Sequence, residues 1–76
     1  MPSNKKPSVH TVPSPQGGWD NKQGGSVTSH ADTKAEAQKL GRLAALEDKT
    51  EHVIHNRDGR ISESNSYGND PFPPRG

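Results

Sequence analysis

The chain has no cysteine among its 76 residues, so neither a disulfide framework nor a thiolate metal site can stabilise its fold. It also has few apolar residues, because Leu, Ile, Val and Phe together occupy ten of the 76 positions. That share lies below the roughly 20% at which chains begin to look disordered. The high net charge of a disordered chain is also missing, since ten basic residues meet nine acidic ones. We expect a marginally stable folded domain, helped by self-association or a partner.

Long hydrophobic runs are absent as well. No stretch reaches the ~18 apolar residues of a membrane span, and no apolar segment follows Lys5 and Lys6 as it would in a secretion signal. We therefore expect a cytoplasmic protein that does not associate with membranes. The formal net charge of +1 gives little non-specific attraction to nucleic acid, although protonation of the four histidines would raise it to +5.

The chain does contain short patterned segments, and the first predicts a strand. Residues 8–12 alternate β-branched with polar side chains and end at a proline, which cannot donate to a sheet ladder. Val9 and Thr11 would lie on one face of this strand, and His10 and Val12 on the other.

Residues 19–22 and 26–29 predict a second and a third strand, each preceded by a Gly-Gly pair that suits a tight turn. Trp19 is the one residue of this meander that is large enough to bury of order 200 Å². Asn21 is a poor strand residue. Either a backbone group satisfies its side chain or the strand is frayed.

The segment Thr33-Lys34-Ala35-Glu36 is a capping box, and from there to Glu47 almost every residue favours a helix. Gly41 lowers the helix propensity by up to ~1 kcal/mol, which close approach of a strand backbone would explain. Leu46 is expected to be exposed or available for a second surface. The residues expected to face the sheet share one arc of the helix: Ala37, Leu40, Gly41, Leu43 and Ala44.

Residues 50–55 and 60–62 predict a fourth and a fifth strand, joined by a hairpin in which Asp58-Gly59 supplies the positive φ. The order strand, strand, strand, helix, strand, strand indicates an α+β fold, with one helix on one face of a small antiparallel sheet. The residues expected to share its core are Trp19, Leu40, Ala44, Val53 or Ile54, and Ile61.

We expect the chain to divide into three segments. Residues 1–7 have nothing to bury and are predicted to be disordered. Residues 8–62 form the single α+β domain. Residues 63–76 form a Gly- and Pro-rich C-terminal tail, which we expect to pack on the domain as a strap.

The last third of the chain carries a family resemblance. Asp58-Gly59-Arg60-Ile61 is followed by the run Gly-Asn-Asp-Pro-Phe-Pro-Pro-Arg-Gly at 68–76, and Gly18-Trp19 and residues 33–37 lie upstream. Together they resemble the small bacterial family called domain of unknown function 2188, over roughly residues 9–76. The resemblance implies an uncharacterised bacterial protein without an established activity. Asn21 departs from the family pattern, which usually has an apolar residue there.

No motif in the sequence indicates catalysis or a cofactor. His52 and His55 are three residues apart in a predicted strand, so they point to opposite faces and cannot chelate one ion. His10 and His55 can meet across neighbouring strands, but two histidines fall short of the three protein ligands of a catalytic zinc. Nucleophile motifs and phosphate-binding glycine loops are absent from the sequence. The sequence thus predicts a non-enzymatic protein with no metal and no cofactor.

Two kinds of partner remain. Lys22, Arg57 and Arg60 are the candidate nucleic-acid contacts, because they lie on predicted hairpins that can meet at one end of the sheet. Asp20 and Asp58 stand beside them, so a salt-bridged surface is the other interpretation.

Trp19, Tyr67 and Phe72 are the candidate partner or self-association surface. The tail that contains Tyr67 and Phe72 is expected to strap the sheet of its own chain or of a neighbouring copy, and the alternative is a free polyproline ligand. We expect a protein-interaction or self-association module, of which a homodimer is one form, with nucleic-acid binding as the alternative.

Overall fold

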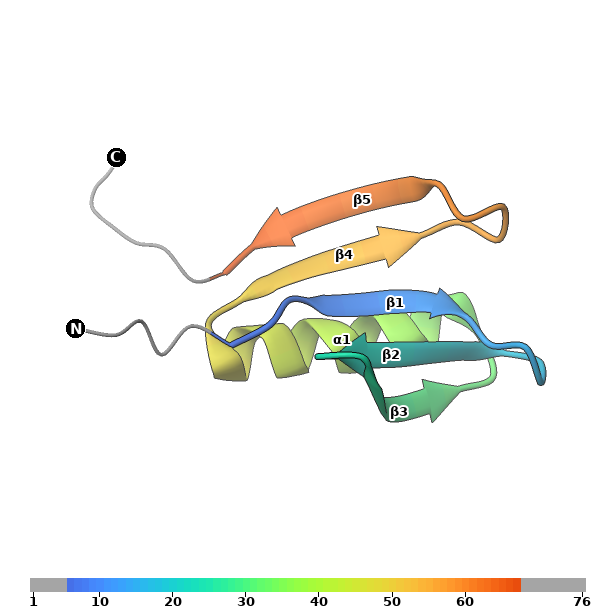
Figure 1. Cartoon of the computed structure of the whole chain (residues 1–76), viewed down its shortest axis with the longest axis horizontal. Coiled ribbons are helices and arrows are strands. Elements are labelled where there is room, and N and C mark those ends of the chain that lie inside the picture. Colours follow the sequence, from blue (N-terminus) through green and yellow to red (C-terminus); the bar gives the residue numbers. More distant parts are fainter. Residues whose placement is uncertain (1–5, 68–76) are drawn as a thin grey trace.

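The computed structural model describes residues 6–67, which form a five-stranded sheet with one helix packed on one face (Figure 1). The expected α+β class and element order are confirmed. Residues 1–5 and the tail from residue 68 lie outside the described residues. The elements in chain order are β1 (Val9–Pro13), β2 (Trp19–Gln23), β3 (Ser26–Ala31), α1 (Lys34–Asp48), β4 (Glu51–His55) and β5 (Ile61–Ser66).

The sheet has the strand order β3-β2-β1-β4-β5 and is mixed, whereas the sequence suggested antiparallel pairing throughout. The two central strands, β1 and β4, run parallel, and the other neighbouring pairs are antiparallel. The cause is the helix between β3 and β4, which returns the chain to the end of the sheet from which β3 started. β4 therefore runs in the direction of β3, and this is also the direction of β1.

Both outer strand pairs contain a β-bulge. The register between β2 and β3 shifts at Asn21/Lys22, and the register between β4 and β5 shifts at Ile54/His55. β5 continues to Ser66, so the first four residues of the expected tail belong to the sheet. In the hairpin before it, Gly59 has the positive φ of 92° that the Asp-Gly pair predicted.

The helix faces the sheet with small residues and not with its leucines. Its buried residues are Ala37, Gly41 and Ala45, which repeat every fourth position. Leu40 is 37% exposed, so its prediction as a core residue is wrong. The helix approaches the sheet so closely at Gly41 that an added Cβ would collide with strand side chains, and no large residue fits beneath it.

Two further expectations about the core need correction. Leu43 is 54% exposed, because it lies on the outward side of the row of small residues. Ile61 is 62% exposed, because β5 is an edge strand that the helix does not cover.

The apolar core is consequently small. Trp19 is buried against Ala31 and Ala37, as expected for the largest side chain of the meander. Lys34 Nζ and Arg57 Cζ lie 5.3 and 5.4 Å from the centroid of the Trp19 ring. Either Val53 or Ile54 was expected in the core, and both are buried.

The ends of α1 follow the local sequence. At its start the Thr33 hydroxyl accepts a hydrogen bond from the backbone N–H of Glu36 at 3.2 Å, as the capping box predicts. At its end Lys49 adopts the left-handed conformation, with φ 54°. No helix within residues 6–67 is long and apolar enough to cross a membrane.

Candidate functional site

Three polar side chains from three strands meet beneath α1. Thr11 of β1, Asn21 of β2 and His52 of β4 are all fully or almost fully buried. Thr11 Oγ1 lies 2.5 Å from Asn21 Oδ1 and 2.7 Å from His52 Nε2. The neighbour that makes room for this buried polar cluster is Gly41, because a Cβ there would come 2.5 Å from Asn21 Oδ1 and 2.9 Å from Thr11 Oγ1.

The hydrogen bonds of Asn21 determine which atom donates and which accepts in every hydrogen bond of the cluster. Asn21 Nδ2 donates to the carbonyl oxygen of Ala37 at 2.9 Å and to Ser29 Oγ at 3.0 Å. Asn21 Oδ1 therefore faces Thr11 and accepts the single hydroxyl proton of that residue. His52 must then donate to the Thr11 oxygen from Nε2. Of the two alternatives that the sequence left open for Asn21, the structure has the first. A backbone carbonyl accepts a hydrogen bond from its side chain, and the second strand is not frayed.

Nε2 of His52 therefore carries a proton, and burial favours the neutral ring, in which Nδ1 is unprotonated. Burial lowers the pKa of His52 and His10 lowers it further, while the nearby Glu63 carboxylate acts in the opposite direction. Within residues 6–67, the second ring nitrogen, Nδ1, has no hydrogen-bond partner. A lone pair is thus left on a side chain that also lines a groove.

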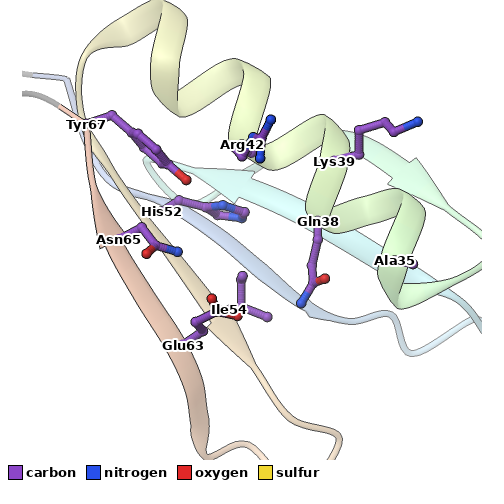
Figure 2. Close-up of a pocket in the computed structure, with 9 residues that line it drawn as sticks. All are labelled: Ala35, Gln38, Lys39, Arg42, His52, Ile54, Glu63, Asn65 and Tyr67. Atoms are coloured by element: carbon purple, nitrogen blue, oxygen red, sulfur yellow. The ribbon is translucent and has the colours of Figure 1, made fainter.

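The groove has a volume of about 470 Å³ and opens between α1 and β5 (Figure 2). It exists because α1 packs over β1 to β4 and leaves the helix-side face of β5 uncovered. The walls carry charges of both signs together with amides and one aromatic ring, which suits a polar or extended ligand. The lining residues are Ala35, Gln38, Lys39 and Arg42 from the helix, and His52, Ile54, Glu63, Asn65 and Tyr67 from the sheet side.

The outward side of α1 carries an apolar ridge made of Leu40, Leu43 and Leu46. These side chains are 37%, 54% and 44% exposed, which confirms the expected exposure of Leu46. Residues three positions apart are neighbours on a helix surface, so the three form one continuous row. They are also all the leucines of the chain. We name this row the leucine ridge.

Charged residues border the leucine ridge on both sides. Lys39 and Arg42 belong to the adjacent row of residues on one side, in which Glu36 precedes them, and Glu47 belongs to the adjacent row on the other side. All four are exposed. Beside Leu43 and Leu46 the ridge is therefore an apolar strip between a basic and an acidic border.

The predicted nucleic-acid contacts do not come together. Lys22 lies next to the turn between β2 and β3, at one end of the strands. Arg57 and Arg60 lie in the β4–β5 hairpin, which is at the other end of the strands (Figure 1). The Arg57 guanidinium sits over the Trp19 ring, and Arg60 Nε lies 3.8 Å from Asp58 Oδ2. The three cations thus form no single basic patch.

The three aromatic residues of the predicted interaction surface also separate. Trp19 is only 5% exposed and belongs to the core, so it offers little surface to a partner. Tyr67 is half-buried and lines the groove, and its backbone N–H donates to the Thr50 carbonyl at 3.2 Å. Phe72 lies outside the described residues.

His10 and His55 meet on the sheet face opposite α1, as the sequence allowed. His10 Nδ1 lies 3.0 Å from His55 Nε2, and the ring centroids are 5.3 Å apart. Burial and the charge of His55 lower the pKa of His10. His52 faces the other side of the sheet, as expected. Residues 6–67 contain no group of three or more side chains placed to hold a metal ion.

These features define a small α+β protein with one helix over a mixed sheet. The chain belongs to the family described as "Uncharacterized protein conserved in bacteria (DUF2188)", whose model matches residues 9–67. The resemblance seen in the sequence is confirmed. Neither a curated protein nor a solved structure matches the chain.

Proposed function

We propose that this protein is a small, non-enzymatic self-association module that binds a second copy through the outward face of α1. The observation that carries the proposal is the leucine ridge. A chain with few apolar residues places all its leucines at the surface, while alanine and glycine fill the helix–sheet interface. Contiguous apolar surface of this kind typically marks an interaction site.

The charged borders of the ridge favour a second copy as the partner. A twofold axis parallel to the two helices places the basic border of each chain, Lys39 and Arg42, against Glu47 of the other chain. Opposite charges then flank the apolar contact on both sides. Such complementarity favours this pairing over a partner with an unrelated charge pattern.

The association is expected to be weak. A helix of 15 residues is about 22 Å long, so a contact limited to one helix face falls at the small end of known interfaces. We therefore expect a dimer in exchange with the monomer, with a dissociation constant in the micromolar range or above.

Sedimentation equilibrium over a wide concentration range tests the proposal. The double variant Leu43→Gln/Leu46→Gln keeps good helix formers at exposed positions and should weaken the dimer at least tenfold. Ile61→Thr removes exposed apolar surface on β5 and serves as the control that should leave the dimer unchanged. A wild-type chain that stays monomeric at every concentration would refute the proposal.

Charge reversal tests the orientation of the two helices. Glu47→Lys should weaken association by itself, and so should Lys39→Glu/Arg42→Glu. A mixture of the two variants should form heterodimers, because each reversed border then meets its opposite. If the mixture associates no better than either variant alone, the parallel twofold arrangement is wrong.

Nucleic-acid binding is the second candidate, and it has less support because Lys22 is remote from Arg57 and Arg60. A gel-shift at low salt tests it, since electrostatic binding must weaken steeply as salt rises. A cytoplasmic location is part of the main proposal, and cell fractionation checks it.

A further inference from the structure

We propose that His10 and His55 form a two-histidine site for a divalent transition metal ion, with Cu(II) and Ni(II) as the best-suited ions. The site lies on the sheet face away from α1, so it depends neither on the leucine ridge nor on the groove. The sequence argued against a catalytic zinc, which uses three protein ligands. A two-ligand site whose other positions are filled by water is a different kind of site.

The distance between the ring nitrogens, which is that of a hydrogen bond in the metal-free protein, is close to the separation that two ligands of one ion need. His10 Nδ1 and His55 Nε2 are 3.0 Å apart. With metal–nitrogen bonds of about 2.0–2.1 Å, this separation corresponds to an angle of roughly 90° at the metal. A tetrahedral ion would need the nitrogens about 3.3 Å apart. Right-angled neighbouring positions are those of the tetragonal geometry that Cu(II) and Ni(II) prefer.

The sheet holds the two ligands in place. β1 and β4 are the central, parallel-paired strands, and His10 lies opposite Val53 in their register. Val53 and His55 are two residues apart in β4 and therefore share the face of His10. Both backbones are fixed by strand pairing on two sides, so little conformational entropy is lost when a metal binds.

The proton balance of the site is simple. One ring now donates an N–H to the other, and a metal needs the lone pairs of both His10 Nδ1 and His55 Nε2. The bridging proton moves to the other nitrogen of its own ring, so no proton is released. Within residues 6–67 those other nitrogens, His10 Nε2 and His55 Nδ1, have no hydrogen-bond partner that would resist the change.

One neighbour opposes metal binding. Lys22 lies opposite His10 in the β1–β2 register and therefore shares its face of the sheet. Its positive charge repels a cation, which keeps the expected affinity moderate. Replacing Lys22 by Gln should therefore strengthen metal binding.

Calorimetric titration of Cu(II) and Ni(II) into the full chain tests the site. We expect one ion per chain, with binding weakened at least tenfold in His10→Gln and in His55→Gln. His30→Gln is the matched control, because His30 is an exposed strand histidine that lies 2.6 Å from Asp20 and away from the pair. The control should bind as tightly as the wild type.

NMR with paramagnetic Cu(II) locates the ion independently of affinity and shows that each variant is folded. Broadening of amide signals should centre on the middle of β1 and the end of β4. Equal affinity in the wild type and His10→Gln, or broadening centred on His30, would overturn the proposal.

Discussion

Gly41 of α1 lies directly above His52 of β4, so close that a Cβ built on the glycine would stand 2.6 Å from His52 Nε2. The contact joins the middle of the helix to the buried polar cluster of Thr11, Asn21 and His52. Each of these side chains is held by hydrogen bonds within the cluster and cannot swing aside freely. The glycine is therefore required by space and not by backbone conformation.

Gly41→Ala should destabilise the protein although alanine is the better helix former. The propensity gain is at most about 1 kcal/mol, whereas overpacking a close-packed site typically costs about 1–3 kcal/mol and here also disrupts buried hydrogen bonds. Chemical denaturation would measure the net loss. The difference between Leu43→Ala and Leu43→Gly, at an exposed position in the middle of the same helix, reports the propensity difference. A Gly41→Ala protein more stable than wild type would contradict the packing described for the cluster.

Stability should fall as the pH falls below about 6.5. In the folded state burial lowers the pKa of His52 from its ordinary value of 6.5, which the unfolded chain regains. The unfolded chain then binds more protons, so the free energy of unfolding is highest above that pH and declines below it. His10, whose pKa is also lowered, acts in the same direction.

The measurement is the unfolding midpoint of the wild type and of His52→Gln across this pH range. Glutamine retains an N–H donor for Thr11 and removes the titrating group, so its pH slope should be shallower. The double variant His10→Gln/His52→Gln should show a shallower pH slope than His52→Gln alone. Identical slopes in all the proteins would exclude both histidines as the cause.

Leu40→Ala should have a small effect on folding. Leu40 is more than a third exposed, so its truncation leaves no large cavity, whereas Ile54 is 4% exposed in the sheet. Ile54→Ala should cost about 2–5 kcal/mol and Leu40→Ala clearly less. Thermal melts of dilute protein, where the proposed dimer would not contribute, compare the two directly. Equal losses would place Leu40 in the core after all.

Removal of residues 69–76 tests the expected strap. The chain passes into this segment just after Tyr67, which lines the groove, so the groove offers the tail a place to dock. Loss of Phe72 from such a site would cost about 1.5–3 kcal/mol and lower the melting midpoint by several degrees. Phe72→Ala should reproduce most of the change. An unchanged midpoint would favour the free ligand, with Pro71-Phe72-Pro73-Pro74 as the binding segment.

Much of the fold could be predicted because it depends on local patterns. The Asp58-Gly59 turn, the Thr33 cap and the alternation in β1 and β4 each have a local physical cause, and the structure has all of them. The meeting of His10 and His55 also followed from strand alternation. The parallel pairing of β1 with β4 required the return path of the helix, which no local pattern contains.

The helix orientation and the polar cluster could not be predicted in the same way. The sequence offered an apolar arc with two large leucines, Leu40 and Leu43, and hydrophobicity alone favours burying them. The structure buries the small residues because three polar strand side chains fill the space beneath Gly41. The available signal in the sequence was a glycine in the middle of the helix together with Asn21 in a strand. We expected Gly41 to approach the backbone of a strand, but the atoms closest to it belong to strand side chains.

The two β-bulges limit how this protein can associate. Each lies in an outer strand pair, β2 with β3 and β4 with β5, where it interrupts the ladder and increases the local twist. Twisted, irregular edges make poor templates for adding the strand of another molecule, so growth into long fibrils is discouraged at both margins of the sheet. The helix side is then the more favourable place for the contact that we propose between two copies, because a symmetric pair formed there closes on itself and stops at two.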